Sequence, residues 1–188
     1  IMMYNLALSK QKTIFLLVNL VLGCILIYSY YYYIKYSNVS IRKLWGNSYP
    51  YRKTFMVSMI FALISWILIV EFILLAAQNT RLNERIISDL SVIQSVIIIV
   101  SMLWLPLTLL YIKSKKNDAL TMLPVIVVLF IVAMASLKQI LIVRQITYDN
   151  CKMAYLSRNL AVIGAIYFFV HTFFVDLVGW NYGFFSQF

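Results

Sequence analysis

The chain has 188 residues, of which 63% are hydrophobic and 12% are charged, and its mean hydropathy is +0.89. A soluble domain would be about half apolar and about a quarter charged, so this sequence lacks the polar residues that cover a water-facing surface and predicts an integral membrane protein. The five glycines and three prolines are too few for the many turns of a β-barrel and favour long helices.

The net charge of +10 lies almost wholly between the apolar runs. We expect these basic segments to contact anionic lipid headgroups. Nucleic acid is not expected as a partner, because the chain has no basic, aromatic-studded soluble segment. Lysine and arginine are nearly balanced between the two sides of the predicted membrane, so they do not set an orientation.

Five apolar runs of about twenty residues divide the chain, and each is long enough at 1.5 Å per residue to cross a hydrocarbon core of roughly 30 Å. They predict an all-α fold, a single domain formed by a bundle of five transmembrane helices. The predicted spans are residues 14–34, 55–77, 92–112, 122–143 and 159–181.

The first span ends in a run of tyrosines, Tyr28 and Tyr30 to Tyr33. Amphipathic rings at the end of a span are typical of the headgroup level, so we interpret this run as an interfacial belt. The segment 35–54 that follows is predicted to be the longest loop. It contains no acid and is expected to contact headgroups or an acidic partner through its basic residues Lys35, Arg42, Lys43, Arg52 and Lys53.

The second span carries Ser58, Ala62 and Ser65 on one helical face, which predicts close approach of a neighbouring helix. Residues 78–91 are predicted to form a loop, in which Ser88 and Asp89 provide the N-cap of the third span.

Two charged residues are predicted to meet inside the membrane. Glu71 and Lys138 each lie about six residues from the same interface, or roughly 9 Å deep, on the second and fourth spans. An unpaired charge at that depth is costly. We therefore expect an ion pair that fixes helix order, with an ion pathway as the alternative.

The fifth span carries the only histidine, His171, together with Asp176. Residues five apart on an α-helix point about 140° away from each other, so the two side chains are not predicted to form a joint site. His171 is expected to be a buried, hydrogen-bonded structural residue, with a proton relay as the alternative. Asp176 is expected near the opposite interface, within reach of Arg52, Lys53 or Lys113.

No pattern in the sequence indicates catalysis or a cofactor. One histidine cannot supply two axial haem ligands, and the two cysteines are not in a metal-binding cluster. The chain has no phosphate-binding glycine loop, nucleophile elbow or HExxH pattern. We therefore expect a protein that is not an enzyme and holds no cofactor.

Three short motifs carry a resemblance. They are Lys43-Leu-Trp-Gly-Asn47 followed by Arg52 and Val57-Ser-Met59, then Trp104-Leu-Pro-Leu-Thr108, and last the H-x4-D-x3-W-x3-F run of His171, Asp176, Trp180 and Phe184. With these motifs the chain resembles a loosely defined set of small polytopic membrane proteins of large DNA viruses and some unicellular algae and protists. The resemblance implies a viral or viral-like membrane protein, located in the internal membrane beneath a capsid, with other membrane or capsid proteins as partners. It implies no particular activity.

The leading functional hypothesis is a non-catalytic structural or assembly component of a membrane complex, in the internal membrane of a large virus particle. One alternative is an accessory subunit of a protist mitochondrial inner-membrane respiratory complex. The other alternative is a small ion or proton channel or transporter that uses Glu71, Lys138, His171 and Asp176.

Overall fold

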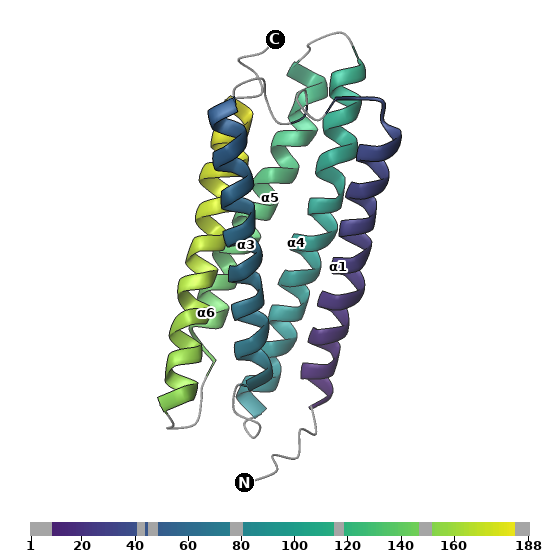
Figure 1. Cartoon of the computed structure of the whole chain (residues 1–188). Coiled ribbons are helices and arrows are strands. Elements are labelled where there is room, and N and C mark those ends of the chain that lie inside the picture. Colours follow the sequence, from purple (N-terminus) through teal and green to yellow (C-terminus); the bar gives the residue numbers. More distant parts are fainter. Residues whose placement is uncertain are drawn as a thin grey trace.

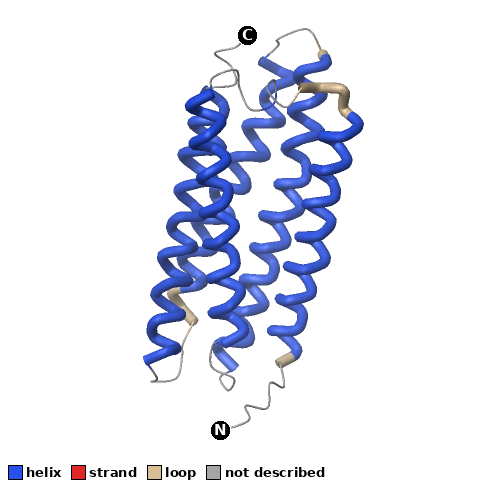
Figure 2. Tube along the Cα trace, viewed as in Figure 1, coloured by secondary structure: helices blue, strands red, loops and turns tan. Residues whose placement is uncertain are grey.

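A computed structural model describes residues 9–40, 44, 49–75, 81–114, 119–146 and 152–182. The described elements are all helical and lie side by side as long rods (Figures 1 and 2). They include five helices long and apolar enough to cross a membrane, which confirms the predicted all-α bundle of five spans. The elements are α1 (Lys10–Tyr36), α3 (Tyr49–Leu75), α4 (Arg81–Lys113), α5 (Ala119–Val143), α6 (Lys152–Val170) and the π-helix η1 (His171–Trp180), which continues α6 without a break.

The helices are not arranged in chain order. α1 packs on α4, α4 on α5, α5 on α6 and η1, and α6 on α3 (Figure 1). α1 and α3 follow each other in the chain, yet they touch only weakly. The bundle is therefore a ring of five helices whose loosest seam lies between α1 and α3.

The prediction of a loop at residues 78–91 is wrong over most of that range, because α4 begins at Arg81. Ser88 and Asp89 consequently lie inside the helix and do not form an N-cap. Ile87 and Leu90 of the same stretch are buried in the bundle core. Their burial favours continuing the helix over the local preference of serine and aspartate for a cap.

The loop predicted at 35–54 is also shorter than expected, because α1 continues to Tyr36 and α3 begins at Tyr49. Lys35 lies in the last turn of α1, and Arg52 and Lys53 lie in the first turns of α3. Arg42 and Lys43 fall outside the described residues.

The bundle is closely packed at the end where α1 begins. A core cluster there draws on all five long helices: Phe15 of α1, Phe72 of α3, Leu90 of α4, Val143 of α5 and Ala161 of α6. Hydrogen bonds join α1 to α3 at this end: Lys12 Nζ donates to the Leu74 carbonyl (3.1 Å), and Trp66 Nε1 donates to Asn19 Oδ1 (3.0 Å).

The predicted close approach at the small residues of α3 is confirmed. Ser58 and Ser65 are buried. Opposite them on α6, a Cβ added to Gly164 would lie 3.0 Å from the Ser65 carbonyl oxygen and 3.3 Å from the Ser65 Cα. Only a residue without a side chain lets the two backbones approach this closely.

The opposite end of the bundle is covered by aromatic rings. Trp104 of α4 lies 6.0 Å from Tyr30 of α1 and 5.3 Å from Trp180 of η1, measured between ring centroids. Trp180 Nε1 donates a hydrogen bond to the carbonyl of Leu44 (3.0 Å), a fully buried residue between α1 and α3. This bond fixes the end of η1 to the α1–α3 connection.

Candidate functional site

Between the packed end and the aromatic end lies a cavity of about 290 Å³, to which all five long helices contribute lining residues. Ile27 of α1 and Leu63 of α3 line it and are nevertheless 71% and 56% exposed. The cavity therefore opens to the outside at the seam between α1 and α3. Because both residues lie near the middle of their helices, the mouth faces the hydrocarbon region of a membrane rather than water.

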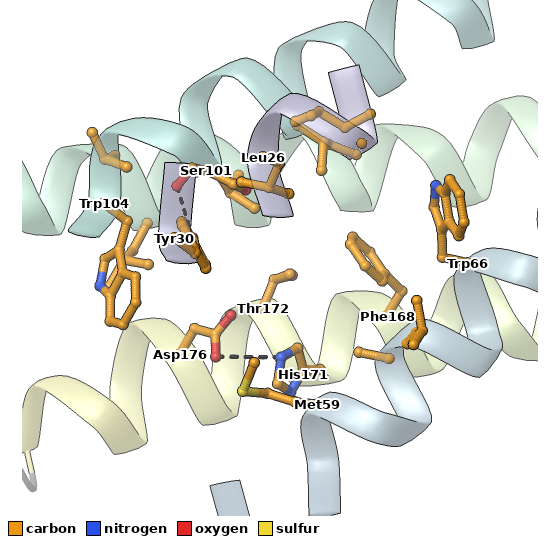
Figure 3. A pocket seen from close by; sticks show the side chains of 18 of the residues that line it. Leu26, Tyr30, Met59, Trp66, Ser101, Trp104, Phe168, His171, Thr172 and Asp176 are labelled. Atoms are coloured by element: carbon orange, nitrogen blue, oxygen red, sulfur yellow. Dashed lines mark hydrogen bonds and ion pairs between the residues drawn. The ribbon is translucent and has the colours of Figure 1, made fainter. Parts of the chain in front are cut away.

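The two ends of the cavity differ in chemistry. Figure 3 shows Asp176 of η1 with Tyr30 and Trp104 at one end of the cavity, and Trp66 and Phe168 at the other end. Thr172 lies between the two ends. Asp176 and the hydroxyl of Tyr30 thus lie at one end of a mainly apolar wall, and a mainly apolar wall with a few polar groups is typical of sites that bind small molecules.

The structure brings His171 and Asp176 together, which corrects the prediction that they point apart. His171 Nε2 lies 3.4 Å from Asp176 Oδ1. The difference arises because residues 171–180 form a π-helix. Hydrogen bonds from i to i+5 place residues five apart next to each other, whereas an α-helix turns them to different faces.

The ring of His171 is held from its other side by hydroxyl groups. Its Nδ1 lies 2.9 Å from Ser58 Oγ, which in turn lies 3.1 Å from the hydroxyl of Tyr167. His171 is 7% exposed. The prediction of a buried, hydrogen-bonded histidine is therefore confirmed, and the hydrogen-bonding partner is Ser58 of α3.

Asp176 does not serve as the interface anchor that the sequence suggested. The structure pairs it with His171 rather than with Arg52, Lys53 or Lys113. Its Oδ1 is buried but has no aligned hydrogen-bond donor. The carboxyl group lines the cavity with part of its surface open, since the side chain is 20% exposed.

Gln94 of α4 is a second polar group of the cavity, and it was not among the residues predicted from the sequence. The residue is 1% exposed, it lines the cavity, and neither Nε2 nor Oε1 of its amide has a hydrogen-bond partner. Gln139 of α5 is equally buried and its amide is unpartnered too, but it does not line this cavity. An amide inside an apolar run was the signal available in the sequence.

Tyr30 corrects the interpretation of the tyrosine run as a uniform interfacial belt. Its hydroxyl donates to the carbonyl of Ser101 on α4 (2.8 Å), and its ring lines the cavity. Tyr28, Tyr31 and Tyr32 of the same run are exposed, as the belt interpretation requires. Because the run extends around the helix, Tyr30 and Tyr33 pack against the bundle core while the other members face outward.

The predicted ion pair between Glu71 and Lys138 is wrong. Both side chains are exposed, and the structure gives no ion pair for either of these described residues. Their helices, α3 and α5, do not neighbour each other in the ring, because α6 packs on both. Matched depth alone did not reveal which helices are adjacent. Long side chains near helix ends also reach the interface without a partner.

The described members of the basic set lie where the chain would leave the membrane. Lys35 Nζ lies 3.1 Å from the hydroxyl of Tyr31 and over the rings of Tyr31 and Tyr36, at 5.3 and 5.4 Å from their centroids. Arg52 is half-buried and Lys53 is exposed. Contact of this set with anionic headgroups stays a prediction.

The described part of the chain has the all-α fold of a multi-pass membrane protein, with five helices of membrane-spanning length around a cavity. No family model, curated protein or solved structure matches the chain. The resemblance to proteins of large DNA viruses and microbial eukaryotes, and the viral or mitochondrial membrane that it suggests, therefore stay predictions.

Proposed function

We propose that the protein binds a small amphipathic molecule, which enters the cavity from the lipid through the mouth between α1 and α3. The observation that carries the proposal is a mainly apolar cavity in which the amide of Gln94 has no hydrogen-bond partner and Asp176 Oδ1 has only the long 3.4 Å contact with His171 Nε2. A buried polar group without a partner costs about 1–3 kcal/mol. A ligand that supplies the missing hydrogen bonds recovers part of this free energy.

The size of the cavity supports a small ligand. Its volume of about 290 Å³ lies at the lower end of the range of roughly 300–1,000 Å³ that is common for ligand sites. The lateral mouth at Ile27 and Leu63 lets an apolar tail extend from the cavity into the acyl chains. Binding of this kind requires no catalytic group. It is therefore compatible with our further proposal that the protein is a non-catalytic component of a larger membrane assembly.

The proposed binding is tested with 8-bromooctan-1-ol, whose bromine quenches tryptophan fluorescence on contact. Trp66, Trp104 and Trp180, three of the four tryptophans, line the cavity. We expect saturable quenching of the full chain in phosphatidylcholine nanodiscs. Gly23→Phe should abolish the saturable part, because Gly23 lines the cavity and a Cβ there meets nothing within 4 Å.

The matched control is Cys24→Phe, which adds the same ring at an exposed neighbouring position that does not line the cavity. It should keep the saturable quenching. Quenching that never saturates in the unmodified protein, or that saturates equally in Gly23→Phe, would show that the bromoalkanol contacts the tryptophans only from the surrounding lipid.

A further inference from the structure

We propose that the polar end of the cavity binds a protonated aliphatic amine, so that the ligand is an apolar molecule with one basic nitrogen. The inference rests on the proposed function, since it names the chemical class of the molecule bound there. Three features carry it: the charge of the cavity, the orientation of His171, and the aromatic wall opposite Asp176.

The charge of the cavity favours a cation. Asp176 is the one acidic residue among the described residues that line it, and no lysine or arginine is among them. The other ionisable side chains in the lining are Tyr30 and His171. A carboxylate buried away from lysine and arginine is stabilised by a ligand that carries the opposite charge.

His171 is held so that it leaves the charge of Asp176 available. When the Tyr167 hydroxyl donates to Ser58, the Ser58 hydroxyl donates to His171 Nδ1, and the ring proton then lies on Nε2, toward Asp176. A neutral imidazole in this tautomer adds no positive charge. Its contact with Oδ1 is long, at 3.4 Å, and Oδ1 has no aligned donor, so the carboxylate keeps its capacity to accept from a ligand.

The wall opposite Asp176 is aromatic. Figure 3 shows the carboxyl group directed toward Tyr30, with Trp104 beside it. The ring centroids of Tyr30 and Trp104 are 6.0 Å apart, and Trp180 meets Trp104 edge to face at 5.3 Å. A cation is attracted to the face of an aromatic ring within about 6 Å of its centroid, most strongly for tryptophan. An ammonium group at this end would have the carboxylate on one side and aromatic rings on the other.

The same ion pair forms whichever way the amine arrives. An ammonium pairs directly with the carboxylate of Asp176. A free amine that partitions through the lipid takes the proton of a carboxylic acid at Asp176 and becomes the ammonium, so one N–H bond forms as one O–H bond breaks. The alkyl tail then lies toward Trp66 and Phe168, at the apolar end of the cavity.

The inference is tested by displacing 8-bromooctan-1-ol with three competitors of equal chain length: octylamine, octan-1-ol and octanoate. The concentration of each competitor is expressed as its amount in the nanodisc per phosphatidylcholine molecule. Differences between the competitors in partition from water into lipid then do not enter the comparison. We expect octylamine to displace the probe at about a tenfold lower concentration than octan-1-ol, as a charge-assisted hydrogen bond would give. Octanoate should be the weakest of the three, because Asp176 repels it.

Asp176→Asn should remove the advantage of octylamine over octan-1-ol, so that the two competitors displace the probe at similar concentrations. The matched control is Glu71→Gln, which removes an exposed acid of α3 that does not line the cavity and should keep the full advantage. Because the comparison of the three competitors uses the unmodified protein, the inference stays testable even if Asp176→Asn does not fold.

The outcomes separate the two proposals. If octan-1-ol displaces the probe and octylamine is no better, the cavity binds amphipaths but the amine inference is wrong. The amine inference is also wrong if the advantage of octylamine survives in Asp176→Asn. If none of the competitors displaces the probe from a saturable site, the proposed function fails, and the amine inference fails with it.

Discussion

At the scale of single residues, the site depends on hydroxyl groups that position a histidine. Ser58 lies 2.9 Å from His171 Nδ1 and 3.1 Å from the Tyr167 hydroxyl, so one serine of α3 connects two side chains of the α6–η1 rod. The small-residue pattern of α3 predicted Ser58 as a packing residue, which it is. The pattern did not identify the bond to His171, because the rotation of one helix against another is set by contacts along their whole length.

Ser58→Ala should destabilise the protein by about 1 kcal/mol, which is typical of a lost hydrogen bond between helices in a membrane protein. The free energy of unfolding in detergent micelles measures the effect. Ser95→Ala is the control, because the Ser95 hydroxyl bonds to the Ser91 carbonyl of its own helix, and its loss should have a smaller effect. Equal losses for the two variants would contradict a bridging role for Ser58.

At the scale of elements, the α6–η1 rod determines the chemistry of the site. The sequence alone predicts an α-helix for residues 171–180. In an α-helix, His171 and Asp176 would lie on different faces. The π-helix adds residues to the turn and places both beside the cavity. Spacing in the sequence predicts shared faces only when the helix type is known, and the π-helix was not predicted.

The contact between α6 and α3 provides a prediction at this scale. Gly164→Ala should destabilise the bundle by about 1–3 kcal/mol, the typical effect of overpacking, because its Cβ would lie 3.0 Å from the Ser65 carbonyl oxygen and backbone atoms cannot turn away. Gly23→Ala is the matched control. It meets open space and should stabilise α1 by about 0.5–1 kcal/mol.

Both glycine variants are measured by unfolding in the same micelles. The free energy of unfolding should decrease in Gly164→Ala and increase in Gly23→Ala. A stabilising Gly164→Ala would mean that α3 and α6 are less closely apposed than the structure shows.

At the scale of the whole molecule, the order of helices in the ring decides which charges can meet. α3 and α5 are separated by α6, so Glu71 and Lys138 should contribute to stability independently. The free energies of unfolding of Glu71→Gln and Lys138→Gln should therefore add within about 0.5 kcal/mol in the double variant. A coupling well above that value would place the two residues in contact and require a different helix order.

The sequence by itself determined the solvent and the elements. Surplus apolar residues in five runs require lipid, and a chain in lipid satisfies its backbone hydrogen bonds within helices. The number of spans followed from length and hydropathy, although α4 begins at Arg81 and not at the predicted residue 92. The packing face of α3 also followed from the sequence, since small residues at helical spacing have few other uses in a membrane.

Only the tertiary structure decided which helices neighbour each other, and therefore which polar groups meet. Apolar faces of different spans resemble each other in composition, so hydropathy does not rank one pairing of helices above another. The ring order excluded the ion pair of Glu71 with Lys138, and the change of helix type at His171 placed that residue beside Asp176. The seam between α1 and α3 left a cavity that no stretch of sequence encodes, because its wall is drawn from all five spans.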